Sequence, residues 1–271
     1  MDLNAIKAKL EALNNNGRQE EKTDYSTIFW KPELGKQTIR IVPSAFDPAF
    51  PFKELTFHYG VGKFPMVALS NFGKQDPIEE FVKELRKTND KDNWSLSGKL
   101  QPKTRVFAPV VVRGEEDKGV RLWGFGVTIY KALLALAEDE DVGDFTDVIN
   151  GWDLVVEMAT GNPYPVTTVR IKPKQTALSN NNELVDTWLK TQPNPVEVHR
   201  QYDYEYIKKA LQNHLTPGSV DDNQSATPGG IDSIDAPSTP NVTQKKTDFT
   251  LETAAASSKT IAMDFDALFS E

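Results

Sequence analysis

Residues 25 to 175 alternate between apolar and polar positions with the period of β-strands, interrupted by stretches with the period of helices. The predicted strands cover residues 38–42, 54–59, 64–69, 103–113, 120–126, 152–159 and 166–172. The predicted helices cover residues 3–13, a segment that opens at Asp76-Pro77, residues 127–137 and residues 203–215. Many short strands with few helices between them favour a mainly β fold with added helices (α+β). We expect a partly open, five-stranded barrel of the OB type with a small subdomain at about 57–95.

The composition divides the chain near Pro217-Gly218. Residues 218–271 contain no Trp or Tyr, and they carry nine acids and three lysines, whereas residues 1–217 carry 30 acids and 28 bases. A segment this polar cannot bury enough apolar surface to fold, so we predict a disordered acidic tail behind a folded core at 22–217. The last eight residues set apolar side chains among carboxylates. We predict a partner-binding tip at 264–271, formed by Asp264, Phe265, Asp266, Leu268 and Phe269.

The amino-terminal segment, residues 1–21, contains a short amphipathic helix with Leu3, Ile6, Leu10 and Leu13 on one stripe. A helix this short is marginal in water by itself. It is either an arm that folds on a partner or a helix docked on its own domain. The segment is too polar and too acidic for a signal peptide, and no apolar run reaches the roughly 20 residues of a membrane helix, so we expect a soluble, intracellular protein.

Several kinds of chemistry find no support in the sequence. The chain has no cysteine, and its three histidines, His58, His199 and His214, show no metal or triad spacing. Gly124-Phe-Gly126 lacks the strand–GxGxxG–helix context of a dinucleotide site, and a glycine within a strand more often marks a bulge or a close approach. The acidic run 138–144 does not match a calcium loop, and a solvated helix end explains it better. We therefore predict no cofactor, no metal and no enzymatic activity.

Cations and aromatic side chains are interleaved in the predicted core. Lys103, Arg105 and Phe107 share one face of a strand, and Arg121, Trp123 and Phe125 share one face of the next. Proteins that bind a single strand of nucleic acid need cations along the phosphates and flat side chains on which bases stack. The same aromatics could instead pack in the core, with the cations only solvating the surface. The candidate DNA-binding residues are Trp94, Lys99, Lys103, Arg105, Phe107, Arg121, Trp123, Phe125, Tyr164, Arg170 and Lys172.

The order and spacing of these residues resemble the single-stranded DNA-binding (helix-destabilising) protein family of T-even-type tailed phages. The resemblance runs from about Thr38 to Met158 and is strongest at 37–44, 94–96, 103–108, 120–130 and 151–152. It implies an OB-type core, a groove lined by basic and aromatic side chains, an arm that links neighbouring copies on DNA, and an acidic tail that recruits replication proteins. In the arm, the resemblance points to Lys7, Lys9 and Arg18 as self-association residues, although the dense basic cluster of the family is missing.

The family archetype holds a zinc ion with one histidine and three cysteines. Here His58 is retained, whereas the family's CPxC turn reads Asp76-Pro77-Ile78-Glu79, and Leu69 stands at or beside the remaining ligand position. One imidazole and two carboxylates make a poor structural zinc site. We predict that apolar side chains hold the subdomain instead, namely Phe64, Met66, Ile78, Phe81 and Leu85.

The predicted function is sequence-independent binding and protection of single-stranded DNA during phage DNA replication, recombination and repair, in the cytoplasm of an infected bacterial host. The predicted partners are single-stranded DNA, further copies of the chain along it, and replication and recombination proteins, with no membrane. The main alternative is a structural or scaffold phage protein whose acidic tail docks on a partner without binding nucleic acid. The sequence does not distinguish DNA from RNA.

Overall fold

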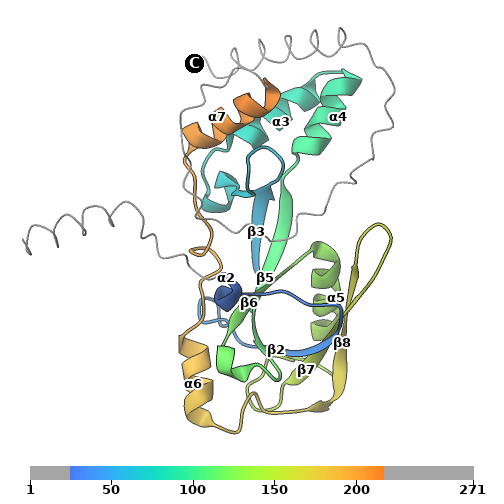
Figure 1. Ribbon diagram of the computed structural model, residues 1–271, viewed down its shortest axis with the longest axis vertical. Coiled ribbons are helices and arrows are strands. Elements are labelled where there is room, and N and C mark those ends of the chain that lie inside the picture. Colours follow the sequence, from blue (N-terminus) through green and yellow to red (C-terminus); the bar gives the residue numbers. More distant parts are fainter. Residues whose placement is uncertain (1–24, 217–271) are drawn as a thin grey trace, which may run out of the picture.

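The computed structural model describes residues 25–216 and arranges them in two lobes joined by two long strands (Figure 1). β3 (Lys53–His58) and β5 (Lys103–Val112) run from one lobe to the other and pair antiparallel. The other strands of the lower lobe are β1 (Phe29–Trp30), β2 (Gly35–Ile41), β6 (Arg121–Phe125), β7 (Trp152–Ala159) and β8 (Val166–Gln175). The fold is therefore mixed α+β, as predicted.

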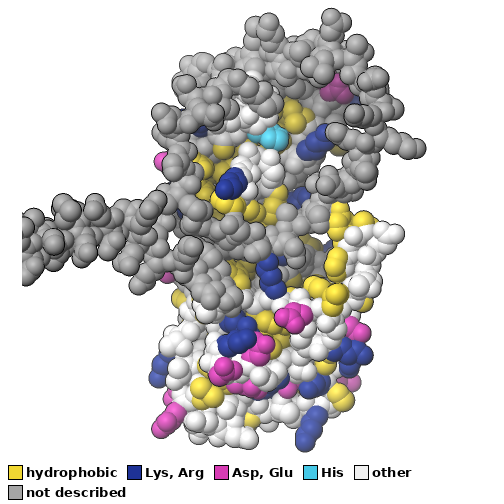
Figure 2. All heavy atoms as spheres, viewed as in Figure 1, with side chains coloured by type: hydrophobic (Ala, Val, Ile, Leu, Met, Phe, Trp, Pro, Cys, Tyr) yellow, Lys and Arg dark blue, Asp and Glu magenta, His cyan; other side chains and the backbone are white. Residues whose placement is uncertain are grey.

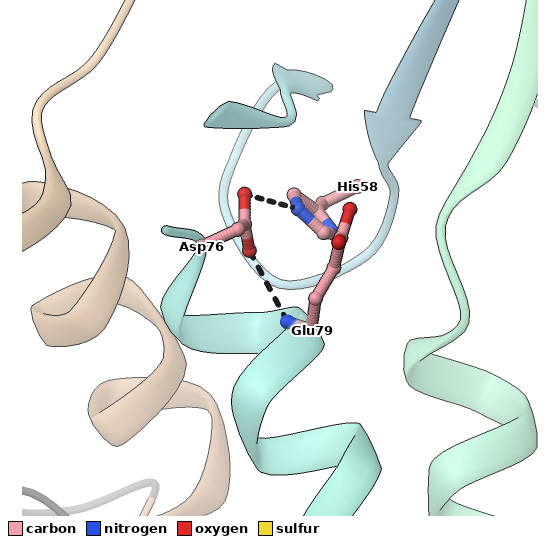
Figure 3. Close-up of side chains that lie close together, drawn as sticks. All are labelled: His58, Asp76 and Glu79. Carbon is pink, nitrogen blue, oxygen red and sulfur yellow. Dashed lines mark hydrogen bonds and ion pairs between the residues drawn. The ribbon is translucent and has the colours of Figure 1, made fainter. Parts of the chain in front are cut away.

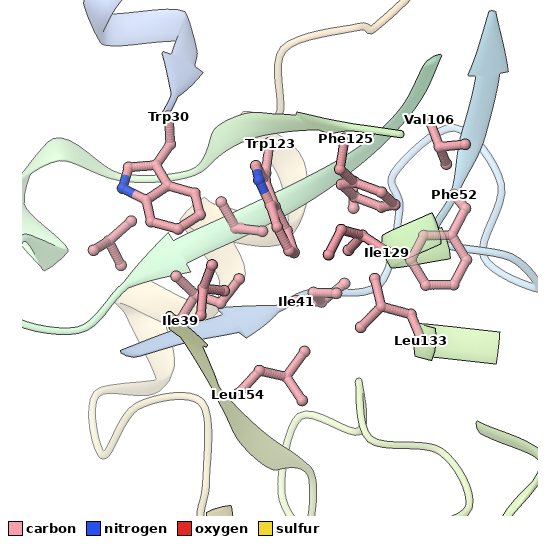
Figure 4. Packing of buried hydrophobic residues seen from close by; sticks show 14 of the residues in the cluster. Trp30, Ile39, Ile41, Phe52, Val106, Trp123, Phe125, Ile129, Leu133 and Leu154 are labelled. Carbon is pink, nitrogen blue, oxygen red and sulfur yellow. The ribbon is translucent and has the colours of Figure 1, made fainter. Parts of the chain in front are cut away.

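The strands form one eight-stranded sheet that does not close. Its order is β1-β6-β5-β2-β7-β8, with β3 added to β5 and β4 (Met66–Val67) added to β3. Every pairing is antiparallel except β1 with β6. The helix α5 (Val127–Glu138) contributes Ile129 and Leu133 to the main core, which they share with Trp30, Trp123 and Leu154 of the strands (Figure 4). The expectation of a mainly β, partly open core with added helices is confirmed.

The upper lobe is built from three helices, α3 (Pro77–Lys87), α4 (Lys91–Leu100) and α7 (Tyr204–Leu215) (Figure 1). The carboxylate of Asp76 caps α3 by accepting hydrogen bonds from the backbone N–H groups of Ile78 and Glu79, and Pro77 occupies the first turn, where its missing N–H costs nothing. The buried side chains of α3 pack on α7. Of the five apolar residues predicted to hold this lobe, Met66, Ile78, Phe81 and Leu85 belong to its core and Phe64 does not. The core consists of Val61, Met66, Leu69, Ile78, Phe81, Val82, Leu85, Leu100, Ile207 and Leu211.

A segment late in the chain returns from the lower lobe to the upper one. After α6 (Asn182–Lys190), which packs on the lower lobe through Val185 and Trp188, residues 191–203 run back along the molecule to α7 (Figure 1). We call residues 191–203 the strap. It covers the second face of β5 and β6, where His199 contacts Phe107 and Phe57. Both faces of these two strands are therefore enclosed.

The short helix α2 (Tyr25–Ile28), the strand β1 and the helices α4 and α6 were not predicted. The segment 64–69 holds only the two-residue strand β4 before a short 3-10 turn at Leu69–Phe72. The other predicted strands and helices within residues 25–216 each coincide with an observed element. Within the same range, no helix combines the length and the apolar character that crossing a membrane requires.

Candidate nucleic-acid interface

The first half of β5 carries two predicted DNA-binding cations across the junction of the lobes. The register pairs Lys103 with Phe57 and Arg105 with Leu55, so both cations lie on one face of the β3–β5 ribbon. Lys103 is exposed and Arg105 is half-buried. The guanidinium of Arg105 donates to the carbonyl of Gly124 at 3.4 Å, and its Nε atom is buried without a hydrogen-bond partner in the described part of the chain. Since this Nε donor is buried, a phosphate would contact the part of the guanidinium that reaches the surface.

Tyr59 lies close enough to Arg105 for their charges to interact. Burial raises the pKa of the Tyr59 phenol, and the positive charge of Arg105 only partly offsets that rise. Tyr59 is therefore a neutral, half-buried aromatic next to a cation at neutral pH. Sequence analysis did not select Tyr59 as a site residue, although it is the last residue of the predicted strand 54–59.

The helix α4 presents the most exposed tryptophan of the described chain. Asp90 caps the helix by accepting hydrogen bonds from Asp92 and Asn93, and Ser97 and Leu100 form its buried side. Trp94 therefore points away from the lobe and is 64% exposed, with Lys99 exposed on the same helix. An indole with an exposed ring offers a stacking platform for a base.

Three other predicted stacking residues are buried, and the expectation that they face a groove is wrong. Trp123 and Phe125 pack in the main core, where Trp123 meets Trp30 edge-to-face at 5.6 Å between ring centroids (Figure 4). Phe107 packs on the opposite face of the same strands, against Phe29, Phe57 and His199. The register explains the separation, because Trp123 lies opposite Ala108 while Phe107 lies opposite Gly124. These rings stabilise the fold and are not available for stacking.

Gly124 is needed where Phe107 packs. A Cβ atom on Gly124 would lie 2.9 Å from the Phe107 ring, so the glycine marks a close approach within the strand, as predicted.

Arg121 is also not free to bind phosphate. It is 5% exposed, and its Nη2 atom forms an ion pair of 2.5 Å with Glu115 in the turn between β5 and β6. The hydrogen bonds from Arg121 and then Lys118 lower the pKa of the Glu115 carboxyl. The prediction of Arg121 as a DNA-binding residue is corrected to a structural role that holds the β5–β6 turn.

The hairpin formed by β7 and β8 carries the remaining predicted residues. Arg170 is exposed and lies opposite Val155, while its neighbours Val169 and Ile171 pack on the main core, so Arg170 faces away from it. Lys172 is half-buried. Tyr164, in the connecting turn, is half-buried, and its hydroxyl has no hydrogen-bond partner in the described chain. This turn projects past α5 toward the upper lobe (Figure 1).

Lys and Arg side chains are visible on both lobes and at their junction, whereas the acidic side chains on the same face lie mostly over the lower lobe (Figure 2). The predicted self-association residues Lys7, Lys9 and Arg18 and the predicted tail tip lie outside the described residues.

His58, Asp76 and Glu79 come together where the resemblance implies a zinc site (Figure 3). One ligand atom from each lies within 4.8 Å of the others. However, both oxygens of Asp76 are already engaged: Oδ2 binds His58 Nε2 at 2.9 Å and Leu69 N at 2.8 Å, and Oδ1 accepts from the first turn of α3. Glu79 accepts from the hydroxyl of Ser70 at 2.6 Å.

The residues present do not fit a structural zinc ion. Leu69 supplies no side-chain ligand, so three donors remain where a closed tetrahedral site needs four. Burial would raise the pKa of the Asp76 carboxyl, but the hydrogen bond and charge of His58 and the backbone donors outweigh it, so this pKa is lowered. The carboxylate therefore serves as a buried helix cap bound to His58.

The structure is a two-lobed α+β protein with exposed cations on both lobes and an exposed tryptophan on α4 of the upper lobe. A family model described as gp32 DNA binding protein like matches residues 33–214. The chain belongs to this family of DNA-binding proteins. No curated protein matches the chain.

Proposed function

We propose that the chain binds single-stranded DNA without regard to sequence and protects it during replication, recombination and repair of a phage genome. The observation that carries the proposal is the exposed indole of Trp94 on the same helix as Lys99, which is followed in the chain by a strand with Lys103 and Arg105, in a chain of a DNA-binding family. Stacking accepts any base, and cations accept any phosphate, so the combination needs no sequence readout.

The proposed surface has a definite set of contacts. Trp94, and Tyr164 from the β7–β8 turn, stack on bases. Lys99, Lys103, Arg105, Arg170 and Lys172 contact phosphates. Each neutralised phosphate contributes a slope of about −0.7 to the dependence of log K on log salt concentration. The proposed binding makes and breaks no covalent bond in the DNA, so the protein coats the strand and does not act as an enzyme.

The segments outside the described residues complete the proposal. Residues 1–21 mediate contact between neighbouring copies through Lys7, Lys9 and Arg18. Residues 218–271 recruit replication and recombination proteins through the apolar and acidic side chains of the tip, and the net negative charge of the tail competes with DNA for the cationic surface. The compartment that fits these roles is the cytoplasm of an infected bacterial host.

The proposal is tested by fluorescence anisotropy with labelled oligonucleotides of equal length. Single strands of mixed and homopolymeric sequence should bind with similar affinity, and a duplex of the same sequence should bind far more weakly, because its bases are not free to stack. Equal affinity for duplex and single strand would contradict the proposal, as would binding to neither.

A further inference from the structure

The loop between β2 and β3 exposes two phenyl rings, of which Phe50 meets the buried Phe52 edge-to-face at 5.4 Å between ring centroids. Phe46 is 52% exposed and Phe50 is 38% exposed, whereas Phe52 is buried against Phe125 and Tyr130. The hydroxyl of Ser44 accepts hydrogen bonds from the backbone of Phe46 and Asp47 and so fixes the start of the loop. The turn is therefore held by its own polar contacts and by the Phe50–Phe52 contact, while Phe46 and the outer part of Phe50 are exposed to a partner.

These rings border a hollow of about 270 Å³ whose far wall is the strap. The strap is tied to the loop by Gln192, whose side chain accepts from Ala45 N at 2.9 Å and donates to the carbonyl of Pro43 at 2.8 Å. The lining is Ser44, Phe46, Asp47, Phe50, Pro51, Phe52, Lys53, Phe107, Pro109, Leu122, Gln192, Pro193, Asn194, Pro195 and Val196. Since both walls are anchored, the hollow is a formed feature of the surface.

The chemistry of the hollow suits one flat ring beside a negative charge. Its volume lies just below the roughly 300–1,000 Å³ of sites for drug-sized ligands, so it holds a single ring system and not several. Lys53 is exposed on its lining. Asp47 also contributes to the lining, but its Oδ1 atom accepts from the backbone of Ala49 within the loop. Phenyl faces with a lysine match a base and its neighbouring phosphate.

The sheet register connects this hollow with the cations at the junction of the lobes. Lys53 lies opposite Phe107, Leu55 opposite Arg105, and Phe57 opposite Lys103. Lys53, Arg105 and Lys103 therefore follow one another along a single face of the β3–β5 ribbon, in successive rows two residues apart, which is about 7 Å per row. The strap covers Phe57 and Phe107 on this face, so only the cationic ends of the row, at Lys103 and Arg105 and at Lys53, are open to a strand of nucleic acid.

We propose that Phe46, Phe50 and Lys53 form a subsite that holds one base of a bound single strand, with the base against the phenyl rings and a phosphate on Lys53. This subsite rests on the proposed function. It extends the proposed contact surface to Lys53, at the lower-lobe end of β3. Residues 43–52 did not enter the sequence-based site. The signal was present as two Phe residues in a polar, proline-containing connection, outside any alternating pattern.

The test compares variants of the full-length protein in anisotropy titrations with a labelled oligo(dT) at one salt concentration. Phe46→Leu keeps an apolar side chain but removes the ring, and Phe46→Tyr keeps the ring. Ile149→Ala is the control, because Ile149 is 71% exposed on a loop that does not line the hollow. We expect Phe46→Leu to raise Kd about 5- to 100-fold, with Phe46→Tyr and Ile149→Ala close to wild type.

Two further titrations identify what binds in the hollow. The loss caused by Phe46→Leu should shrink on an oligonucleotide with abasic sites, and a comparison with oligo(rU) tells whether the subsite accepts RNA as well as DNA. If wild-type protein binds but Phe46→Leu binds equally well, the subsite is wrong and the proposed function stands. If Phe46→Leu instead only weakens self-association in sedimentation, the hollow holds a second copy and the subsite is likewise wrong. A wild-type protein that binds no single strand would overturn both proposals.

Discussion

The imidazole of His199 on the strap lies 5.0 Å, centroid to centroid, from the ring of Phe107 on β5. Phe57 and Phe29 complete its surroundings, and its Nε2 atom has no hydrogen-bond partner within the described residues. The contact joins residues 92 positions apart and closes the strap over the sheet. It also places a titratable group where a charge would have no solvent and no partner.

Burial lowers the pKa of His199 from 6.5 to about 4. The unfolded chain therefore takes up a proton as the pH falls below 6.5, while the folded chain stays neutral until about pH 4, so stability decreases with falling pH across this window. The full loss is about 3 kcal/mol. His199→Phe should remove most of this dependence. Urea unfolding between pH 6.5 and 5, above the titration of most carboxylates, measures it, and an unchanged slope in the variant would contradict the assignment.

Asp76 should contribute more to stability than an ordinary helix cap. Asp76→Ala removes the cap of α3 and leaves His58 and the N–H of Leu69 buried without a partner, which predicts a loss of about 3 kcal/mol or more in the free energy of unfolding. Asp90→Ala is the matched control, because Asp90 caps α4 at the surface and should cost about 1 kcal/mol. Equal losses would mean that the contact with His58 adds nothing.

The same cluster should make the upper lobe independent of metal. We expect a chelator to leave the melting temperature unchanged, because hydrogen bonds engage both Asp76 oxygens and residues 25–216 bring only three ligand side chains together here. One equivalent of zinc in protein washed free of loosely bound metal, together with a lower melting temperature after chelation, would contradict this account.

Trp123 and Trp94 should respond in opposite ways to truncation. Trp123→Ala empties part of the main core and should cost about 3–5 kcal/mol of stability. Trp94→Ala, at an exposed position, should leave the melting temperature nearly unchanged and weaken binding to single strands by about 1–3 kcal/mol. The sequence-based assignment of Trp123 to DNA binding predicts a different result for Trp123→Ala, namely weaker binding and an intact fold. Thermal melts and anisotropy titrations of both variants decide between the two assignments.

The strands could be predicted from alternation because each has one clearly apolar face, and the bounds of β7 coincide with the predicted segment 152–159. The helix α4 escaped prediction because four of its ten residues are Ser, Gly or Asn and only two of its residues are buried. The sequence placed Phe107 and Trp123 correctly on alternating positions of their own strands. It could not give the register between the strands, which puts the two rings on opposite faces. Nor could it show that the strap, some 90 residues later, covers Phe107.

Removal of residues 218–271 should leave single-strand affinity unchanged or increase it, because nine acids that compete for the cationic surface are lost. Contacts with replication proteins should disappear in the same variant. A matched variant that keeps the tail but replaces Phe265 and Phe269 with Ala should lose the partner contacts while it retains wild-type DNA affinity. Lower DNA affinity in the truncated protein would contradict a competing tail.

The most direct test of the central claim is a titration of tryptophan fluorescence with poly(dT) at two salt concentrations, for wild type and Trp94→Phe. Trp30, Trp123 and Trp188 are buried, and Trp152 is half-buried with its Nε1 atom hydrogen-bonded to the carbonyl of Val142, so quenching should come mainly from Trp94. The account predicts quenching in the wild type that weakens at the higher salt concentration. It also predicts that most of the quenching is lost in Trp94→Phe, with binding by anisotropy retained. No quenching of the wild type at low salt, or equal quenching in both proteins, would contradict it.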